Sequence, residues 1–228
     1  MNIRMISSMA TQALLSDLNQ QFQAIQPDTT VSLVSVGGVS AAERVQAGET
    51  FDVVVLAANA IDQLSASGQL LAESRIDLAR SDVALAIRAD SPVPDIRTEA
   101  NVKAAVLAAA SVGISTGPSG VAVNALFERW GMADVLRERI VTAPPGVAVG
   151  SLVASGEVAL GFQQLSELKD LPGITVLGPL PSAIQIITTF SAARTMACEQ
   201  PEAVQALLAF LASAATADSK QAHGMSPA

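Results

Sequence analysis

The fold of this chain is decided by residues 112–120, which read VGISTGPSG. A short apolar run ends there in small hydroxyl and glycine residues, and we expect a strand at 112–114 and a helix at 119–130. A junction of this kind offers free backbone N–H groups at the positive end of a helix dipole, with hydroxyls beside them. The stretch therefore predicts an α/β unit whose strand-to-helix turn can hold an anion.

The same kind of junction occurs four more times along the chain. In each case a short apolar run stops at small polar or glycine-rich residues, and the stretches concerned are residues 3–8, 34–40, 140–146 and 160–164. Several such junctions that meet at one point would form a pocket for a small oxyanion, built from neutral donors. The pattern predicts that the protein holds a small anion.

Strands and helices alternate along the rest of the sequence, which is typical of an α/β protein with mostly parallel sheets. Residues 52–56, DVVVL, form a near-continuous apolar run, as expected of a parallel strand buried on both faces. The expected strands are residues 3–6, 31–36, 52–56, 83–87, 112–114, 140–142, 158–162 and 184–190. A closing helix begins near Pro201, and the alanine-rich tail from Ala212 is expected to fray.

Two expected strands carry the chain between two lobes. The proline-containing loop at 91–94 follows the strand at 83–87 and a change of composition, and the strand at 184–190 returns the chain. We therefore expect one lobe from residues 1–82 with 188–228 and a second from residues 83–187, with the ligand cleft between them. Each lobe is expected to be a mostly parallel sheet flanked by helices.

Composition excludes several classes of partner. The chain has 228 residues, a formal net charge of −8 and no basic or aromatic-rich stripe, so we expect no nucleic acid to bind. Tyrosine is absent and aromatic residues make up 3%, which argues against a site that stacks sugars or bases. The single cysteine cannot form an internal disulfide, so cysteine usage does not indicate export.

The start of the chain lacks the features of a secretory signal, which needs a basic start, an uninterrupted apolar stretch and a small-residue cleavage site. No apolar segment reaches membrane-spanning length, because Ser, Asp, Gln or Gly interrupts each one. We expect a cytoplasmic protein if Met1 is the natural start, a periplasmic one if a leader was removed, and no membrane insertion in either case.

Five short motifs carry a resemblance to a known family. They are SSM at residues 7–9, GGVS at 37–40, AGETFD at 47–52, PSG at 118–120 and GFQQ at 161–164. With the two crossings between lobes, the chain resembles the type 2 periplasmic-binding-protein fold and, within it, the molybdate-binding proteins of ABC transporters. The resemblance spans nearly the whole chain.

Three departures from that family stand at the expected site. Gln164 takes the place of a tyrosine that often touches the oxyanion, and the serine of the second turn is replaced by Gly38 or displaced to Ser40. The usual Ala-Asp after the third strand is Ala58-Asn59. A carboxylate ligand fits these changes better than molybdate, because amides and hydroxyls bracket planar oxygens without a cation.

The GFQQ strand end resembles the strand end of one subgroup of this family. The members of that subgroup resemble aconitate isomerase. The resemblance implies a 1,3-allylic proton shift on an unsaturated di- or tricarboxylate. In such a shift one group removes a proton beside a carboxylate, and helix N-termini stabilise the dienolate-like charge. It implies no metal and no organic cofactor.

The candidate ligand-binding residues lie at the ends of expected strands or in the turns that follow them. They are Ser7, Ser8, Gly38, Val39, Ser40, Ser119, Gly120, Gly146, Gln163 and Gln164. Each serine has an alternative role as an ordinary N-cap and each glycine as a turn residue, whereas two adjacent amides at the end of an apolar strand have no obvious place in a core. The sequence identifies no catalytic base and no metal ligand.

Other reactive groups have simpler interpretations. We expect Glu167 and Arg44 to be solvated charges on helix faces, His223 to be a surface histidine and Cys198 to be packing. One histidine cannot supply a metal cluster, and no Gly-Lys-Ser/Thr phosphate loop or Gly-x-Ser-x-Gly elbow is present. Two functions therefore remain open: an isomerase of an unsaturated carboxylate, and a non-catalytic binding protein for molybdate or another oxyanion of an ABC transporter.

Overall fold

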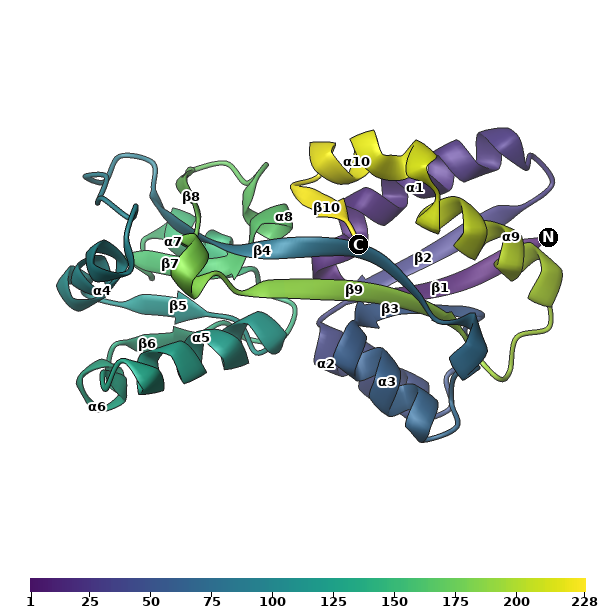
Figure 1. Ribbon diagram of the computed structural model, residues 1–228, viewed down its shortest axis with the longest axis horizontal. Helices are drawn as coiled ribbons and strands as arrows, with labels where there is room; N and C mark the ends of the chain where they lie inside the picture. Colours follow the sequence, from purple (N-terminus) through teal and green to yellow (C-terminus); the bar gives the residue numbers. More distant parts are fainter. The chain divides into compact units, whose positions relative to one another are not determined.

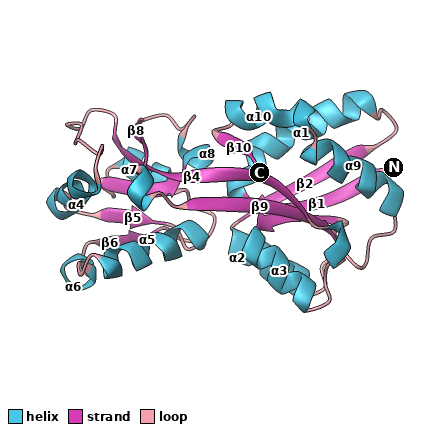
Figure 2. Cartoon of the chain, viewed as in Figure 1, coloured by secondary structure: helices cyan, strands magenta, loops and turns pink.

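The computed structural model describes residues 1–228 and divides into two compact units. Unit 1 contains Met1–Ser81 and Thr189–Ala228, and unit 2 contains Asp82–Thr188. Two strands, β4 (Ile76–Arg88) and β9 (Ile187–Arg194), each have residues in both units. Figure 2 draws both as continuous strands.

The sheet of unit 1 has the order β2-β1-β3-β9. β1 is parallel to both β2 and β3, whereas β9 runs antiparallel to β3. The first three strands are β1 (Asn2–Ser8), β2 (Thr30–Val36) and β3 (Val53–Ala57). The last strand of the chain, β10 (Met225–Pro227), pairs antiparallel with β4, with Met225 opposite Ser81.

Helices cover both faces of this sheet. Figure 1 shows α1, α9 and α10 on one side and α2 and α3 on the other. Their bounds are α1 (Gln12–Ile25), α2 (Gly38–Gln46), α3 (Ala58–Ala66), α9 (Pro201–Ala212) and α10 (Ala217–Ala222), with short 3₁₀ turns at η1 (Met9–Thr11), η2 (Ala72–Ser74) and η4 (Ala214–Thr216).

The side chains of β3 show why both faces are covered. All five of its residues are buried, and successive side chains of a strand point to opposite faces. Val53 and Val55 pack with leucines of α1 and α9, whereas Val54 and Leu56 pack with α2 and α3. This is the behaviour expected of the apolar run at 52–56.

The sheet of unit 2 has the order β4-β7-β5-β6, with β8 pairing β4 as well. β5 is parallel to β6 and β7, and β4 is antiparallel to β7 and β8. The bounds are β5 (Val112–Ile114), β6 (Ile140–Thr142), β7 (Leu160–Gln164) and β8 (Ile174–Pro179).

The helices of unit 2 separate into two packing groups. One core joins α4, α5 and α6 to Leu160 and Phe162 of β7, and a second set of contacts packs α7 and α8 on the other face. The bounds are α4 (Glu99–Ala108), α5 (Pro118–Arg129), α6 (Ala133–Leu136), α7 (Val149–Ser155) and α8 (Leu165–Leu168), with a 3₁₀ turn at η3 (Ser182–Ile184).

Glycines allow α7 to approach the sheet closely. A Cβ at Gly113 would lie 2.8 Å from Val149 Cγ1, and one at Gly161 would lie 2.7 Å from Val153 Cγ2. Both distances are shorter than real Cβ contacts, so neither position accepts a side chain without movement of α7. The glycines of the two apolar runs therefore have a packing role.

The two units share one strand order. In unit 1 the parallel strand β1 lies between β2 and β3, and in unit 2 β5 lies between β6 and β7. In unit 1 the antiparallel strand β9 pairs with β3, and in unit 2 the antiparallel strand β4 pairs with β7. In each unit the helices that follow the two adjacent strands, α1 and α3 or α5 and α8, lie on opposite faces of the sheet, and in open α/β sheets ligands bind at such a position.

Several expectations about single elements need correction. The strand expected at 83–87 is the end of the thirteen-residue β4, the strand expected at 184–190 is shifted to β9, and β8 was missed. The tail from Ala212 does not fray, because α10 packs on α1 and β10 extends the sheet. No helix has both the length and the apolar character that a membrane crossing needs.

We predict that the C-terminal strand stabilises unit 1. Met225 is 4% exposed and lies in the core that α1 and α9 form, so Met225→Ala should lower the free energy of unfolding by about 2–5 kcal/mol. The matched control is Met196→Ala, because Met196 is 61% exposed and its loss should change stability by about 0.5 kcal/mol or less. Urea unfolding measures both, and equal effects would contradict the assignment of β10 to the core.

Candidate functional site

The carboxyl ends of the parallel strands in unit 1 gather small polar residues at one edge of the sheet. β1 ends at Ser7 and Ser8, and the register places Ser8 opposite Val36, the last residue of β2. After β2 the chain enters α2 through Gly37, and after β3 it enters α3 directly. The predicted residues Gly38, Val39 and Ser40 are the first three residues of α2.

Contacts join the end of β1 to its neighbours within unit 1. The Ser7 hydroxyl lies 2.7 Å from the Ser35 hydroxyl, and Ser8 Oγ lies 3.5 Å from Thr11 Oγ1. A Cβ built on Gly38 would lie 3.7 Å from Ser8 Cβ, so the first residue of α2 is in van der Waals range of the strand end. The structure thus brings Ser8 and Gly38 together, whereas the Ser7 hydroxyl pairs with Ser35, and the role of these residues in an anion site stays a prediction.

The corresponding edge of unit 2 gathers a second set. β5 and β7 are parallel with Gly113 opposite Gly161, so the residues after Ile114 lie beside the end of β7. There the hydroxyls of Ser115 and Ser119 are 3.1 Å apart. Ser119 is the second residue of α5 and is buried.

Two of the predicted glycines have structural explanations. A Cβ at Gly120 would lie 1.8 Å from the carbonyl oxygen of Ser115, so the close approach of α5 to the preceding loop requires glycine. Gly146, in the loop after β6, is exposed and has φ +81°, a left-handed conformation that glycine adopts readily. These observations account for both glycines without a ligand, and their role in binding stays a prediction.

The helices at these two edges begin without side-chain caps. The N-cap residues of α2, α3 and α5 are Gly37, Ala57 and Gly117, and none makes a side-chain cap hydrogen bond. By contrast, Thr98 caps α4 by accepting a hydrogen bond from Asn101 N at 3.2 Å. Ser40 and Ser119 lie inside their helices, so the alternative that they are N-caps is wrong. Free N–H groups in the first turn are the donors that an anion needs.

Gln163 and Glu167 form a hydrogen-bond chain that the sequence did not reveal. Gly150 N in the first turn of α7 donates to Gln163 Oε1 at 3.0 Å, and Gln163 Nε2 donates to Glu167 Oε1 at 2.9 Å. Gln163 is 2% exposed, and these contacts use both ends of its amide. The expectation that Glu167 is a solvated charge is wrong, because α8 folds back and leaves this side chain half-buried beside Gln163.

Burial raises the pKa of Glu167 to about 7, and the hydrogen bond from Gln163 opposes that rise because it favours the charged carboxylate. A carboxyl group with a pKa near neutrality can both accept and donate a proton under physiological conditions. Perturbed groups of this kind concentrate at functional sites. Glu167 is therefore the residue of this edge best suited to proton transfer.

Gln164 is held with one polar atom unsatisfied. Its side chain is 3% exposed, Nε2 lies 2.6 Å from Thr188 Oγ1, and Oε1 is buried with no hydrogen-bond partner. If the amide turned over, the threonine hydroxyl would donate to the oxygen and the NH₂ group would lack the partner instead. The first orientation leaves the acceptor oxygen unpaired, and only the second leaves a donor for an anionic ligand. An unpaired buried group of this kind costs about 1–3 kcal/mol.

The sequence found part of this arrangement. It identified the serines and glycines at the strand ends and the two glutamines, but it missed Ser35, Ser115, Thr188 and the role of Glu167. Ser115 stands in the stretch that decides the fold and could have been added from its neighbours. The contacts of Ser35 and Thr188 have no local sequence signal, because each joins residues that are more than twenty positions apart. The ligand cleft expected between two lobes stays a prediction.

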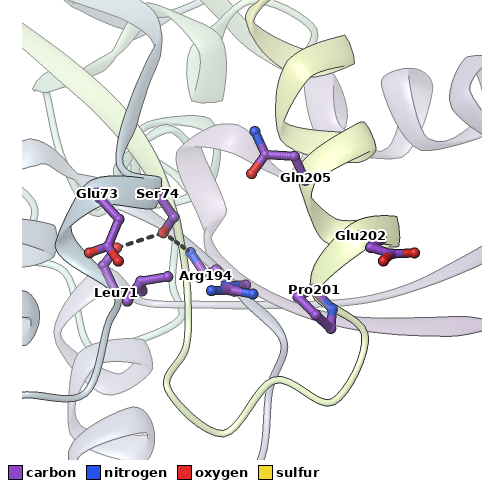
Figure 3. Close-up of a pocket in the computed structure, with 7 residues that line it drawn as sticks. All are labelled: Leu71, Glu73, Ser74, Arg194, Pro201, Glu202 and Gln205. Atoms are coloured by element: carbon purple, nitrogen blue, oxygen red, sulfur yellow. Dashed lines mark hydrogen bonds between the residues drawn. The ribbon is translucent and has the colours of Figure 1, made fainter.

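A separate cavity of about 490 Å³ lies in unit 1, at the end of β9 that pairs with the start of β3. Figure 3 shows its lining, where the Ser74 hydroxyl donates to the Leu71 carbonyl at 2.6 Å and accepts from Arg194 N at 2.9 Å. Two glutamates among the lining residues make it a poor anion site. The lining residues are Leu71, Glu73, Ser74, Arg194, Pro201, Glu202 and Gln205.

Comparison with known proteins gives consistent matches. The family model described as bacterial extracellular solute-binding protein matches residues 3–226. Aconitate isomerase from Pseudomonas sp is 40% identical over 187 residues, which cover 81% of this chain and 70% of that protein.

Solved structures share the fold at lower identity. The periplasmic molybdate-binding protein of Azotobacter vinelandii has a TM-score of 0.81 at 21% identity and covers 98% of each chain. The sulfate-binding protein of Mycobacterium tuberculosis has a TM-score of 0.80 at 15% identity, over 99% of this chain and 86% of that one. These likenesses confirm the α/β fold of the two-lobed periplasmic-binding-protein type.

We predict that the site serines contribute little to stability. Ser40→Ala should change the free energy of unfolding by about 0.5 kcal/mol or less, because Ser40 is not the N-cap of α2. Thr98→Ala, which removes a real cap, should cost about 0.5–2 kcal/mol. Thermal unfolding of the two variants measures both changes. If Ser40→Ala lowered the free energy of unfolding as much as Thr98→Ala, Ser40 would have a structural role.

Proposed function

Because this chain belongs to the family of bacterial extracellular solute-binding proteins, we propose that it binds a small carboxylate anion and isomerises it by a 1,3-allylic proton shift. The substrate that we propose is an unsaturated di- or tricarboxylate such as aconitate. The relationship to aconitate isomerase over most of the chain supports this reaction. The motifs that suggested this subgroup from the sequence point in the same direction.

One observation carries the anion site: α2, α3 and α5 begin at the carboxyl edges of their sheets, so that their first-turn N–H groups lie at those edges. Hydroxyls of Ser8 and Ser119 lie at the same edges, and so does the Gln164 amide, which donates to a carboxylate in the orientation that turns its NH₂ group away from Thr188. These donors are neutral, and the residues of these turns include no lysine or arginine. Backbone N–H groups at the positive ends of helix dipoles then supply the attraction for the carboxylates.

The same donors suit the charge that develops during the reaction. When a proton leaves the methylene group of aconitate, the electrons of the C–H bond form a new double bond, and negative charge moves onto carboxylate oxygens. Fixed N–H groups stabilise this charge without reorganising, as an oxyanion hole does. The proton then returns to the carbon at the far end of the three-carbon unit.

A second function is supported by the fold relatives that bind molybdate and sulfate. It is a non-catalytic substrate-binding protein for molybdate or another oxyanion of an ABC transporter. Gln164 in the place of a tyrosine, and the serine of the second turn replaced by Gly38 or displaced to Ser40, favour a planar carboxylate over a tetrahedral metal oxide. The extracellular character of the family supports a periplasmic location, and the cytoplasmic location expected for a natural start at Met1 stays a prediction.

The reaction itself separates the two functions. We predict that the purified chain, incubated with trans-aconitate without added metal or nucleotide, forms the cis isomer, which NMR detects directly. A binding protein would leave aconitate and related unsaturated acids unchanged. Unaltered acids after long incubation, together with sub-micromolar binding of molybdate or tungstate by calorimetry, would replace the isomerase with the transporter-type receptor.

Gln164 should contribute to affinity and not to stability. A hydrogen bond to a charged ligand is worth about 1.5–3 kcal/mol, so Gln164→Met should weaken aconitate binding by about 10- to 150-fold. Its thermal stability should change little, because the substitution removes an unsatisfied buried atom and also removes the hydrogen bond to Thr188. The matched control is Gln20→Met on the exposed side of α1. Unchanged affinity with a large loss of stability would make Gln164 a core residue.

A further inference from the structure

One ionisable side chain stands out at the carboxyl edges of the two sheets. Three parallel strands end there in each unit, and the residues that end these strands or follow them are 7–12, 37–42, 57–61, 115–120, 143–148 and 163–168. Within these ranges Glu167 is the only acidic or basic residue, and the next one after β3, Asp62, pairs with Arg75 at 2.9 Å. A proton shift needs such a group, and the neutral hydroxyls and amides around it cannot act as bases at their ordinary pKa values.

The structure holds the Glu167 carboxylate at one oxygen. Gly150 N fixes the carbonyl end of the Gln163 amide, so the NH₂ end is directed at Glu167 Oε1. This hydrogen bond leaves Oε2 without a partner in the chain. The free oxygen can take a proton while the other stays anchored, which is the geometry that a general base needs.

No charged side chain contributes to the pKa of Glu167. α8 packs against β7 and β8, and α7 lies on the same face. β7, β8 and α7 contain no titratable residue, and Lys169 and Asp170, which follow α8, pair with each other at 3.3 Å. β4 also packs against α8, through Ala84 and Ala86, and its charged residues are Asp77, Arg80, Asp82 and Arg88. Burial alone therefore raises the pKa of this carboxyl, opposed by Gln163.

We propose that Glu167 is the catalytic acid–base residue that carries the proton in the allylic shift, with Gln163 as its positioning residue. This inference rests on the proposed isomerase function. Glu167 Oε2 takes a proton from the methylene carbon of the substrate, and the electron pair of that C–H bond becomes part of a new carbon–carbon double bond. The old double bond opens toward the conjugated carboxylate. The same oxygen then returns the proton to the carbon two positions away, so that Glu167 ends as the carboxylate and no cofactor is consumed.

The test compares Glu167→Gln with the wild type. The variant should lower the rate of aconitate isomerisation by about 100-fold or more, which is the range that general acid–base groups contribute. Calorimetry should show aconitate binding that is no weaker than in the wild type, because the substitution removes a negative charge. Glu138→Gln, which changes an exposed glutamate after α6, should keep the wild-type rate.

A pH profile tests the same assignment without depending on that variant. The wild-type kcat/KM should fall as pH decreases through about 7, because protonated Glu167 cannot accept a proton. Gln163→Met should move this limb to higher pH, since the hydrogen bond that it removes holds the pKa of Glu167 down. A merely structural glutamate would leave the limb in place.

The outcomes separate the two claims. A wild-type chain that forms no isomer from aconitate overturns the proposed function and this inference with it. Wild-type activity with an undiminished rate in Glu167→Gln overturns the inference alone. Lost activity together with lost binding in Glu167→Gln also overturns it, because the residue would then hold the ligand and not move the proton.

Discussion

Parallel strands that share a sheet must end at the same edge, and the rest of this structure depends on that constraint. It brings Ser8 at the end of β1 beside the start of α2, and Ser115 beside the end of β7, although the sequence separates these residues by tens of positions. Each following helix then presents its unpaired N–H groups at that edge. Because both units have the same strand order, the chain builds this donor-rich edge twice. The two donor-rich edges are therefore a consequence of topology before they are a matter of particular side chains.

The absence of cations from these turns has an electrostatic consequence. Two like charges 5 Å apart interact with about 3 kcal/mol at an effective dielectric constant of 20. A bound polycarboxylate near Glu167 would thus raise the pKa of that carboxyl further and favour its protonated form after the first proton transfer. The N–H groups offset this by stabilising the charge on the substrate. Proton transfer in both directions requires this balance, whereas simple binding does not.

The sequence predicted what local patterns encode and missed what distant contacts impose. The run at 52–56 predicted a doubly buried strand, and residues 112–120 predicted the turn and helix that the structure contains. β10 could not be foreseen, because Met225 pairs with Ser81 far along the chain. The sequence predicts a solvated charge at Glu167, and this is wrong for the same reason. The burial of Glu167 depends on the packing of α8 against β7 and β8, and its hydrogen bond depends on α7, which fixes Gln163. The four residues of α8 are too few for their periodicity to predict the burial of Glu167 or its hydrogen bond.

A binding protein and an isomerase can share this frame and differ in one group. A ligand held only by N–H groups, hydroxyls and amides meets nothing able to take its proton, so it leaves unchanged. A carboxylate added on the solvated side of a helix would also do little, because its ordinary pKa makes it too weak a base at neutral pH. Placing that carboxylate where burial raises its pKa, with a glutamine that fixes one of its oxygens, changes the chemistry without changing the fold. The adjacent glutamines of β7 differ in the same way, because successive residues of a strand face opposite sides: Gln163 donates to the Glu167 carboxylate, whereas Gln164 bonds Thr188 and keeps one unpaired polar atom.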